Sequence, residues 1–259
     1  MRSGVLACLL LFFVVSPAQA DPPFPRIPVS VILAGDEADG LDAFRETLRL
    51  AVSRRDRDAV LAQVSPEFAC FRDFGGLCEG TGGRASFELI FVFDDTKLSP
   101  EYAGWGWRRL AAMLNARTVG PVPKGQMLSG EYEELGYLCE PAQPMLKDSA
   151  AAEAAAASRG SDFWFDWAYV EAGGVRLRAG PSAGTAILDA LSWEAVPVVG
   201  LETVKGEGAP EGWIEITAPS GRRGFVAARY LQSFLAPRLC YARDRQGNWS
   251  IAAHVGGGD

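Results

Sequence analysis

The fold of this chain is decided by residues 175–231, which contain Val175-Arg-Leu-Arg-Ala-Gly-Pro-Ser182, then Gly212-Trp-Ile-Glu-Ile216, then Gly224-Phe-Val226, then Tyr230-Leu231. Apolar residues come here in short runs, and clusters of glycine, proline and serine separate the runs. Such a pattern is typical of short β-strands joined by tight turns. Glycine permits a positive φ and proline presets a corner. The stretch therefore predicts a small β-barrel.

The order of these four pieces resembles the bacterial Src-homology-3-like (SH3-like) domain, which extracytoplasmic proteins often use to hold cell-wall material or a protein partner. Two features depart from the family pattern. Arg176 stands where the family often has asparagine, and 201–211 is a long loop where the family usually turns sharply. The resemblance implies a binding role but names no ligand. The matching positions are Arg178, Gly180, Pro181, Ser182, Gly212, Trp213, Gly224, Phe225, Val226, Tyr230 and Leu231.

The resemblance also indicates which side chains would bind. Trp213, Phe225 and Tyr230 would form an aromatic groove for a short peptide, such as a cell-wall stem peptide. The alternative interpretation is that these aromatic residues fill the barrel, because such side chains bury a large area. Arg178, together with Arg176 and Arg229, could donate charge-assisted hydrogen bonds to a ligand carboxylate. The alternative for these arginines is a solvated surface.

The rest of the chain divides into further units. Residues 1–20 resemble a signal peptide, with Arg2 before a short apolar run and Ala18-Gln-Ala20 as the cleavage pattern. The alanine-rich part of 149–167 has no large apolar stripe with which to pack, so we interpret this segment as a hinge. The expected units are the signal peptide (1–20), a proline-rich arm (21–40), an N-terminal α+β domain (41–148), the hinge (149–167), the SH3-like barrel (168–234) and a C-terminal hairpin on the N-terminal domain (235–259).

Helices dominate the expected N-terminal domain. The apolar spacing predicts helices over 41–54 and 102–114, and Asp56 can cap a shorter one that ends near residue 64. Segment 85–93 is apolar on every face, so it can be a buried helix or a strand. The order of two helices before strands, with Trp249-Ser-Ile251 near the end, resembles the nuclear-transport-factor-2-like fold, whose curved sheet forms a pocket. The fold class is therefore α+β, with a mainly helical N-terminal unit.

Composition limits the classes of partner. The 259-residue chain has a formal net charge of −7, and 48% of its residues are apolar. An acidic protein is not attracted to phosphate backbones, so we expect no nucleic-acid partner. The sequence shows no later segment that is long and apolar enough to span a membrane. We therefore expect an exported protein, periplasmic or secreted, with no transmembrane segment and an oligomeric state that the sequence does not define.

Four cysteines remain once Cys8 leaves with the signal peptide, and an even number in an oxidising compartment predicts two disulfides. Three connectivities are possible. We favour Cys70–Cys78, because Gly75-Gly76 between them lets the chain fold back, and Cys139–Cys240. The alternative, a metal site, lacks the close Cys-x-x-Cys spacing that such sites show. We expect no metal and no cofactor.

Catalytic groups are scarce in this sequence. His254 is the only histidine, so a Cys-His peptidase or a histidine-rich zinc hydrolase is hard to build. We expect a non-enzymatic protein of the cell envelope that binds peptidoglycan or a periplasmic protein. The alternatives are a carboxylate-dependent cell-wall hydrolase targeted by the barrel, and an inhibitor or immunity-type protein. The carboxylates available to the hydrolase are Glu88, Asp94, Asp95, Glu131, Glu133 and Glu134.

Overall fold

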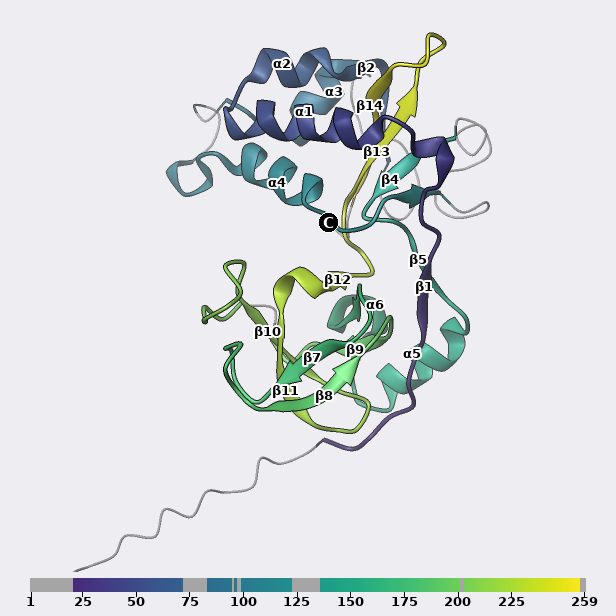
Figure 1. The fold of residues 1–259 in the computed structure, drawn as a ribbon, viewed down its shortest axis with the longest axis vertical. Helices are drawn as coiled ribbons and strands as arrows, with labels where there is room; N and C mark the ends of the chain where they lie inside the picture. The colour runs from purple at the N-terminus through teal and green to yellow at the C-terminus, as the bar shows by residue number, and fades with distance from the viewer. Residues whose placement is uncertain are drawn as a thin grey trace, which may run out of the picture.

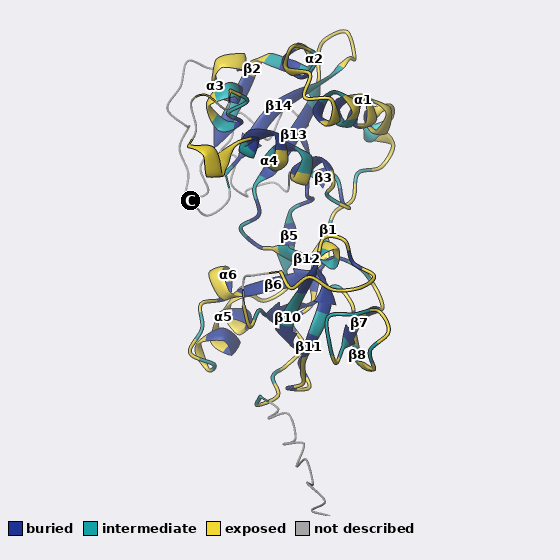
Figure 2. Cartoon of the chain, turned by 90° about the vertical axis from the view of Figure 1, so that its left-hand side faces the viewer, coloured by how far each residue is buried: buried dark blue, intermediate teal, exposed yellow. Residues whose placement is uncertain are grey.

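A computed structural model describes residues 21–71, 83–94, 96, 99–122, 136–200 and 203–256. Within these ranges the chain forms two lobes, one above the other in Figure 1. Among the described residues, the upper lobe contains four α-helices and a five-stranded sheet, and the lower lobe contains two short helices and two smaller sheets. Buried residues gather on the strands of each lobe (Figure 2), so each lobe has its own core. The expected α+β class is confirmed.

The helices of the upper lobe follow the apolar pattern of the sequence. Leu48 and Val52 are buried on the stripe expected for 41–54. Asp56 caps the next helix by accepting a hydrogen bond from the amide of Ala59 at 3.0 Å. The helices are α1 (Leu41–Ser53), α2 (Arg57–Ala62), α3 (Gly83–Ile90) and α4 (Trp105–Leu114), with short 3-10 turns η1 (Asp36–Ala38) and η3 (Pro100–Tyr102).

A five-stranded sheet lies beside these helices, so the N-terminal unit is less helical than expected. Its strands, in spatial order, are β2 (Val64–Phe71), β14 (Trp249–Val255), β13 (Arg238–Arg243), β4 (Leu138–Glu140) and β3 (Gly120–Pro121). Strands β2 and β14 are parallel, and the other neighbours are antiparallel. The ambiguous segment 85–93 forms most of α3 and the residues after it, with Phe87 and Phe91 fully buried.

A disulfide connects the two middle strands of this sheet. Cys139 on β4 and Cys240 on β13 are register partners and are bonded, although 101 positions separate them in the sequence. The expected Cys139–Cys240 bridge is therefore confirmed, and a disulfide is compatible with an oxidising compartment. The expected Cys70–Cys78 bridge lies outside the described residues, because Cys78 is not among them.

One ion pair is buried beside the disulfide. Glu140 is fully buried and accepts hydrogen bonds from the guanidinium of Arg45 on α1 and from the hydroxyl of Tyr241 on β13. Burial raises the pKa of the Glu140 carboxyl, and Arg45 opposes that rise. Because no described cavity reaches this carboxylate, we assign the cluster to the packing of α1 on the sheet.

The lower lobe is built from short strands. They are β6 (Trp167–Val170), β7 (Val175–Arg178), β8 (Ile187–Leu191), β9 (Ala195–Pro197), β10 (Trp213–Thr217), β11 (Arg223–Ala227) and β12 (Leu231–Ser233), with the 3-10 turn η5 (Ala228–Tyr230) before β12. They form a β10-β11-β7-β8 sheet and a β12-β6-β9 sheet, which a bridge between Val198 and Ile216 connects. Among the described residues these pairings do not close a barrel, so the SH3-like architecture stays a prediction.

Two helices precede these strands, α5 (Ser149–Ala157) and α6 (Phe163–Asp166). Ala152, Ala155 and Ala156 of α5 are buried in a cluster with Phe163 and Trp167. The sequence shows no large apolar stripe here, yet a face of methyl groups lets the helix lie close to the aromatic rings. The alanine-rich segment is therefore a helix that packs against this aromatic cluster.

The N-terminal arm runs along both lobes as extended chain (Figure 1). Its β1 (Val29–Val31) pairs with β5 (Pro144–Leu146) in a two-stranded ribbon between the lobes. Asp21 forms ion pairs with Arg223 and Arg159 and accepts a hydrogen bond from Thr217 at 2.9 Å. The start of the arm is thus fastened to the lower lobe.

Candidate functional site

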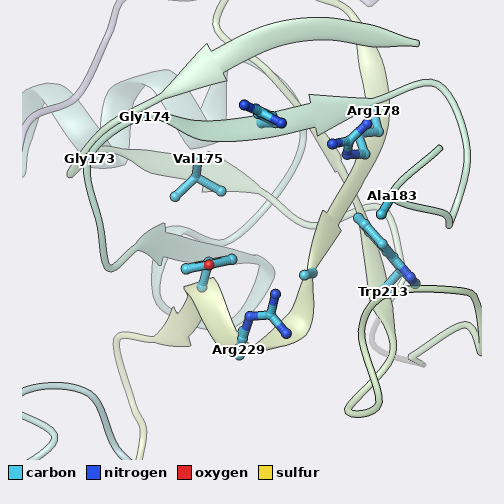
Figure 3. A pocket seen from close by; sticks show the side chains of 11 residues that line it. Gly173, Gly174, Val175, Arg178, Ala183, Trp213 and Arg229 are labelled. Carbon is cyan, nitrogen blue, oxygen red and sulfur yellow. The ribbon is translucent and has the colours of Figure 1, made fainter. Parts of the chain in front are cut away.

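A cavity of about 280 Å³ opens on the lower lobe, and Figure 3 shows the side chains around it. Arg178 comes from β7, Trp213 from β10, and Arg229 and Tyr230 from η5. Because these elements are neighbours in space but far apart in sequence, the cavity exists only once the strands have paired. Its other lining residues are Gly173, Gly174, Val175, Arg176, Ala183, Gly208 and Ala227.

The Gly-Trp pair shapes one wall of this cavity. Gly212 has a φ of 93°, and a Cβ there would lie 3.0 Å from Cβ of Thr203. Glycine is therefore required both for the backbone conformation and for the close approach. The next residue, Trp213, is only 3% exposed, and its indole Nε1 has no hydrogen-bond partner among the described residues. Trp213 is thus both part of the core and part of the cavity wall.

Two arginines lie close to the ring of Tyr230. The guanidinium carbons of Arg117 and Arg229 are each 5.0 Å from the centre of its ring. Cations attract the face of an aromatic ring. The sequence already places Arg229 directly before Tyr230. Arg117, in contrast, comes after α4 of the upper lobe, and nothing in the sequence points to its contact with Tyr230.

The cavity carries an excess of positive charge. Arg176 is exposed, and Arg178 donates to the backbone oxygen of Thr185 at 2.8 Å. Arg229 pairs with Glu211 at 3.1 Å. No carboxylate lines the cavity itself among the described residues, so three arginines face it and only one of them has an acidic neighbour there. The arrangement suits an anionic group on the ligand.

Of the four residues that the sequence singled out, Arg178, Trp213 and Tyr230 line one cavity. Phe225 is not among its lining residues. It is half-buried against a small cluster that contains Ala209 and Ala227, which agrees with the packing alternative for this ring. The aromatic part of the cavity therefore consists of Trp213 and Tyr230.

A second cavity, of about 590 Å³, adjoins the first and lies between the end of α4 and the lower lobe. The two cavities share Arg229, and Arg117 and Glu171 line the second. Burial raises the pKa of the Glu171 carboxyl, and a hydrogen bond donated by Thr118 of the upper lobe opposes the rise. Sequence reasoning missed this region because its residues belong to units expected to be separate.

The structure describes His254, Glu88 and Asp94 among the candidate catalytic residues. Burial lowers the pKa of His254 to about 3, and neither ring nitrogen has a hydrogen-bond partner in the described part of the chain. Glu88 is paired with Arg57, and Asp94 accepts a hydrogen bond from the hydroxyl of Thr96 at 2.6 Å. The remaining carboxylates proposed for a hydrolase, Asp95, Glu131, Glu133 and Glu134, lie outside the described residues.

Over the residues that the structure describes, no group of three His, Cys, Asp or Glu side chains is arranged to hold a metal ion. In the same residues, every helix is too short or too polar to cross a membrane. Comparison of the chain with protein-family models, with curated proteins and with solved structures finds no match. The site must therefore be interpreted from its own chemistry.

Proposed function

We propose that this protein is an exported, non-enzymatic binding protein of the cell envelope, and that its lower lobe is an SH3-like unit. The observation that supports this proposal most is that Arg178, Trp213 and Tyr230 line one cavity, although they lie in separate pieces of the motif. The ligand is peptidoglycan or a periplasmic protein, and nucleic acid is not a partner. The formal net charge of −7 supports the last point, because phosphate backbones repel an acidic protein.

The chemistry of the cavity favours a short peptide that ends in, or carries, a carboxylate. Arg176 is exposed and has no hydrogen bond or ion pair of its side chain to another described residue. A guanidinium in this position can bind a carboxylate through two parallel hydrogen bonds. Tyr230 offers a ring against which an alkyl part of the peptide can pack. A wall stem peptide has both features.

Co-sedimentation of residues 21–259 with purified peptidoglycan sacculi tests this proposal, with soluble muropeptides assayed in parallel. We expect the protein to pellet with sacculi, and Arg176→Gln to weaken binding by about three- to tenfold, as for the loss of one ordinary hydrogen bond at an exposed residue. The matched control is Arg245→Gln. It makes the same change of charge at an exposed residue of the turn between β13 and β14, away from the cavity.

Each result has a definite meaning. If both variants weaken pelleting equally, net charge rather than the cavity governs binding, and the proposed site is wrong. Released muropeptides would contradict the non-enzymatic assignment and favour a hydrolase. A protein that stays in the supernatant excludes the wall as ligand. The proposal then survives only if a periplasmic protein binds and Arg176→Gln weakens that complex.

A further inference from the structure

The upper lobe has an arginine-lined groove of its own. A cavity of about 360 Å³ lies between α1 and α4, which run side by side in Figure 1. Its charged lining residues are Arg49, Arg55 and Arg108, and no aspartate or glutamate lines it among the described residues. In a chain with a formal net charge of −7, three cations around one groove form a marked local exception, although Arg49 is paired with Glu46 at 3.3 Å.

Two of these guanidinium groups approach one point. A Cβ placed on Gly104 would lie 3.1 Å from Nη2 of Arg55 and 3.3 Å from Nη1 of Arg108. Two positive charges this near to one point repel each other, and an anion between them would reduce the repulsion. Arg108 donates to the backbone oxygen of Ala103, whereas the side chain of Arg55 has no hydrogen bond or ion pair to any described residue. The pair therefore has donors left for an acidic ligand.

The floor of the groove is apolar. Val52, Trp107 and Leu114 line it and are themselves buried, and Ala111 lies beside them. Inorganic phosphate would satisfy the arginines but would leave this floor uncovered. A ligand that covers the floor and binds the arginines has an apolar group flanked by negative charges.

The groove adjoins the other cavities. Asn115, at the end of α4, lines both this groove and the cavity of about 590 Å³ between the lobes. That cavity in turn shares Arg229 with the cavity at Tyr230. An extended chain that leaves the groove at Asn115 therefore enters a region lined by Arg117 and Arg229, and also by Glu171 and Glu211.

We propose that the groove between α1 and α4 binds an acidic segment of a partner protein, with one large apolar side chain on the floor and carboxylates on Arg55 and Arg108. An anionic membrane surface is less suitable, because the remaining acidic surface of the protein would be repelled by it. The inference goes beyond the function proposed above, because this site belongs to the other lobe and does not depend on the cavity at Tyr230.

Fluorescence anisotropy with a labelled synthetic peptide, one phenylalanine flanked on each side by three glutamates, tests the site on residues 21–259. We expect saturable binding, weakened about tenfold by Arg55→Asn and by Arg108→Gln, since each removes charge-assisted hydrogen bonds. Asparagine is chosen because residue 55 has a φ of 54°, which asparagine tolerates. The matched control is Arg54→Gln, an exposed neighbour outside the groove, with an expected change below about twofold.

The thermal unfolding of each variant, followed by circular dichroism, checks that the fold is intact. Equal weakening by Arg54→Gln would mean that only net charge matters and would overturn the site. The site is also overturned if the labelled peptide does not bind at millimolar concentration, or if a glutamine version binds as well as the glutamate peptide. Binding to vesicles of anionic phospholipid that depends on Arg55 and Arg108, without peptide binding, would replace the protein partner by a lipid surface.

Discussion

Glu140 and His254 illustrate two ways in which this fold buries an ionisable side chain. Glu140 keeps hydrogen bonds from Arg45 and Tyr241, so removal of either partner would leave a buried group unsatisfied. His254 on β14 instead packs edge-on against Phe91, with ring centres 5.7 Å apart, and is 3% exposed. Burial, and in addition the positive charge of Arg109, lower its pKa to about 3. His254 is therefore a neutral core residue.

We predict that His254 makes the protein less stable as the pH falls. The unfolded chain takes up a proton near pH 6.5, whereas the folded chain takes it up near pH 3. The unfolded state thus binds more protons between these values, so the free energy of unfolding decreases by up to about 1.4 kcal/mol per pH unit there. Replacement by phenylalanine, which cannot titrate, should remove this part of the pH dependence.

The measurement is urea unfolding of the native protein and of His254→Phe at several pH values from 7 to 4. All carboxylates are common to both proteins, so the difference between the two pH profiles isolates the histidine. Parallel profiles would show that His254 takes up its proton equally in the folded and unfolded states and would contradict the prediction.

The residues of the candidate site were predictable only in part. Arg178, Trp213 and Tyr230 belong to a motif with an order that can be recognised, and they share one cavity. The orientation of Phe225 could not be predicted, because an aromatic residue in such a strand serves equally well in a core or in a groove. Arg117 gave no signal, since its contact with Tyr230 depends on how the two lobes meet.

At the level of elements, local pattern predicts the structure where the elements are long and amphipathic. The segment expected as a helix over 41–54 is α1, and the one over 102–114 contains α4. Strands β3 and β4 have only two and three residues. Strand β4 pairs with β13, which lies about a hundred positions further along the chain, and β3 pairs with β4. Such strands carry too little periodicity to be recognised before their partners are known.

Helix α5 allows a prediction about close packing. Ala155 is buried against the aromatic cluster, whereas Ala154, its neighbour, is exposed. We expect Ala155→Leu to lower the free energy of unfolding by about 1–3 kcal/mol, because the added methylene and methyl groups overfill the space. Ala154→Leu, with the same change of side chain, should alter it by less than about 0.5 kcal/mol. Chemical denaturation of both variants measures their free energies of unfolding. Equal effects of the two substitutions would mean that the alanine face is not closely packed.

In the order of the chain, the lower lobe is an insertion between two strands of the upper lobe. Strand β4 precedes the lower lobe and β13 follows it, and the two lie side by side in the upper sheet. The expected disulfide already pointed to this arrangement, because a bond between Cys139 and Cys240 brings the two ends of the insertion together. The parallel pairing of β2 with β14 could not be foreseen, since it joins segments far apart in the described chain and no local pattern encodes it.

Since the loop closed by this disulfide contains the strands of the lower lobe, we predict that its loss costs a large part of the free energy of unfolding. A closed loop of about 100 residues stabilises by about 4–5 kcal/mol through the entropy of the unfolded chain. The Cys139→Ala/Cys240→Ala variant should therefore lose about this much free energy of unfolding. Hydrogen exchange should accelerate more in β4 and β13, at the base of the insertion, than in β7 and β8, whose core stays intact. A loss below about 1 kcal/mol would show that the pairing of β4 with β13 holds the lobes together without the covalent bond. Equal acceleration in both sheets would contradict the expected local effect at the base of the insertion.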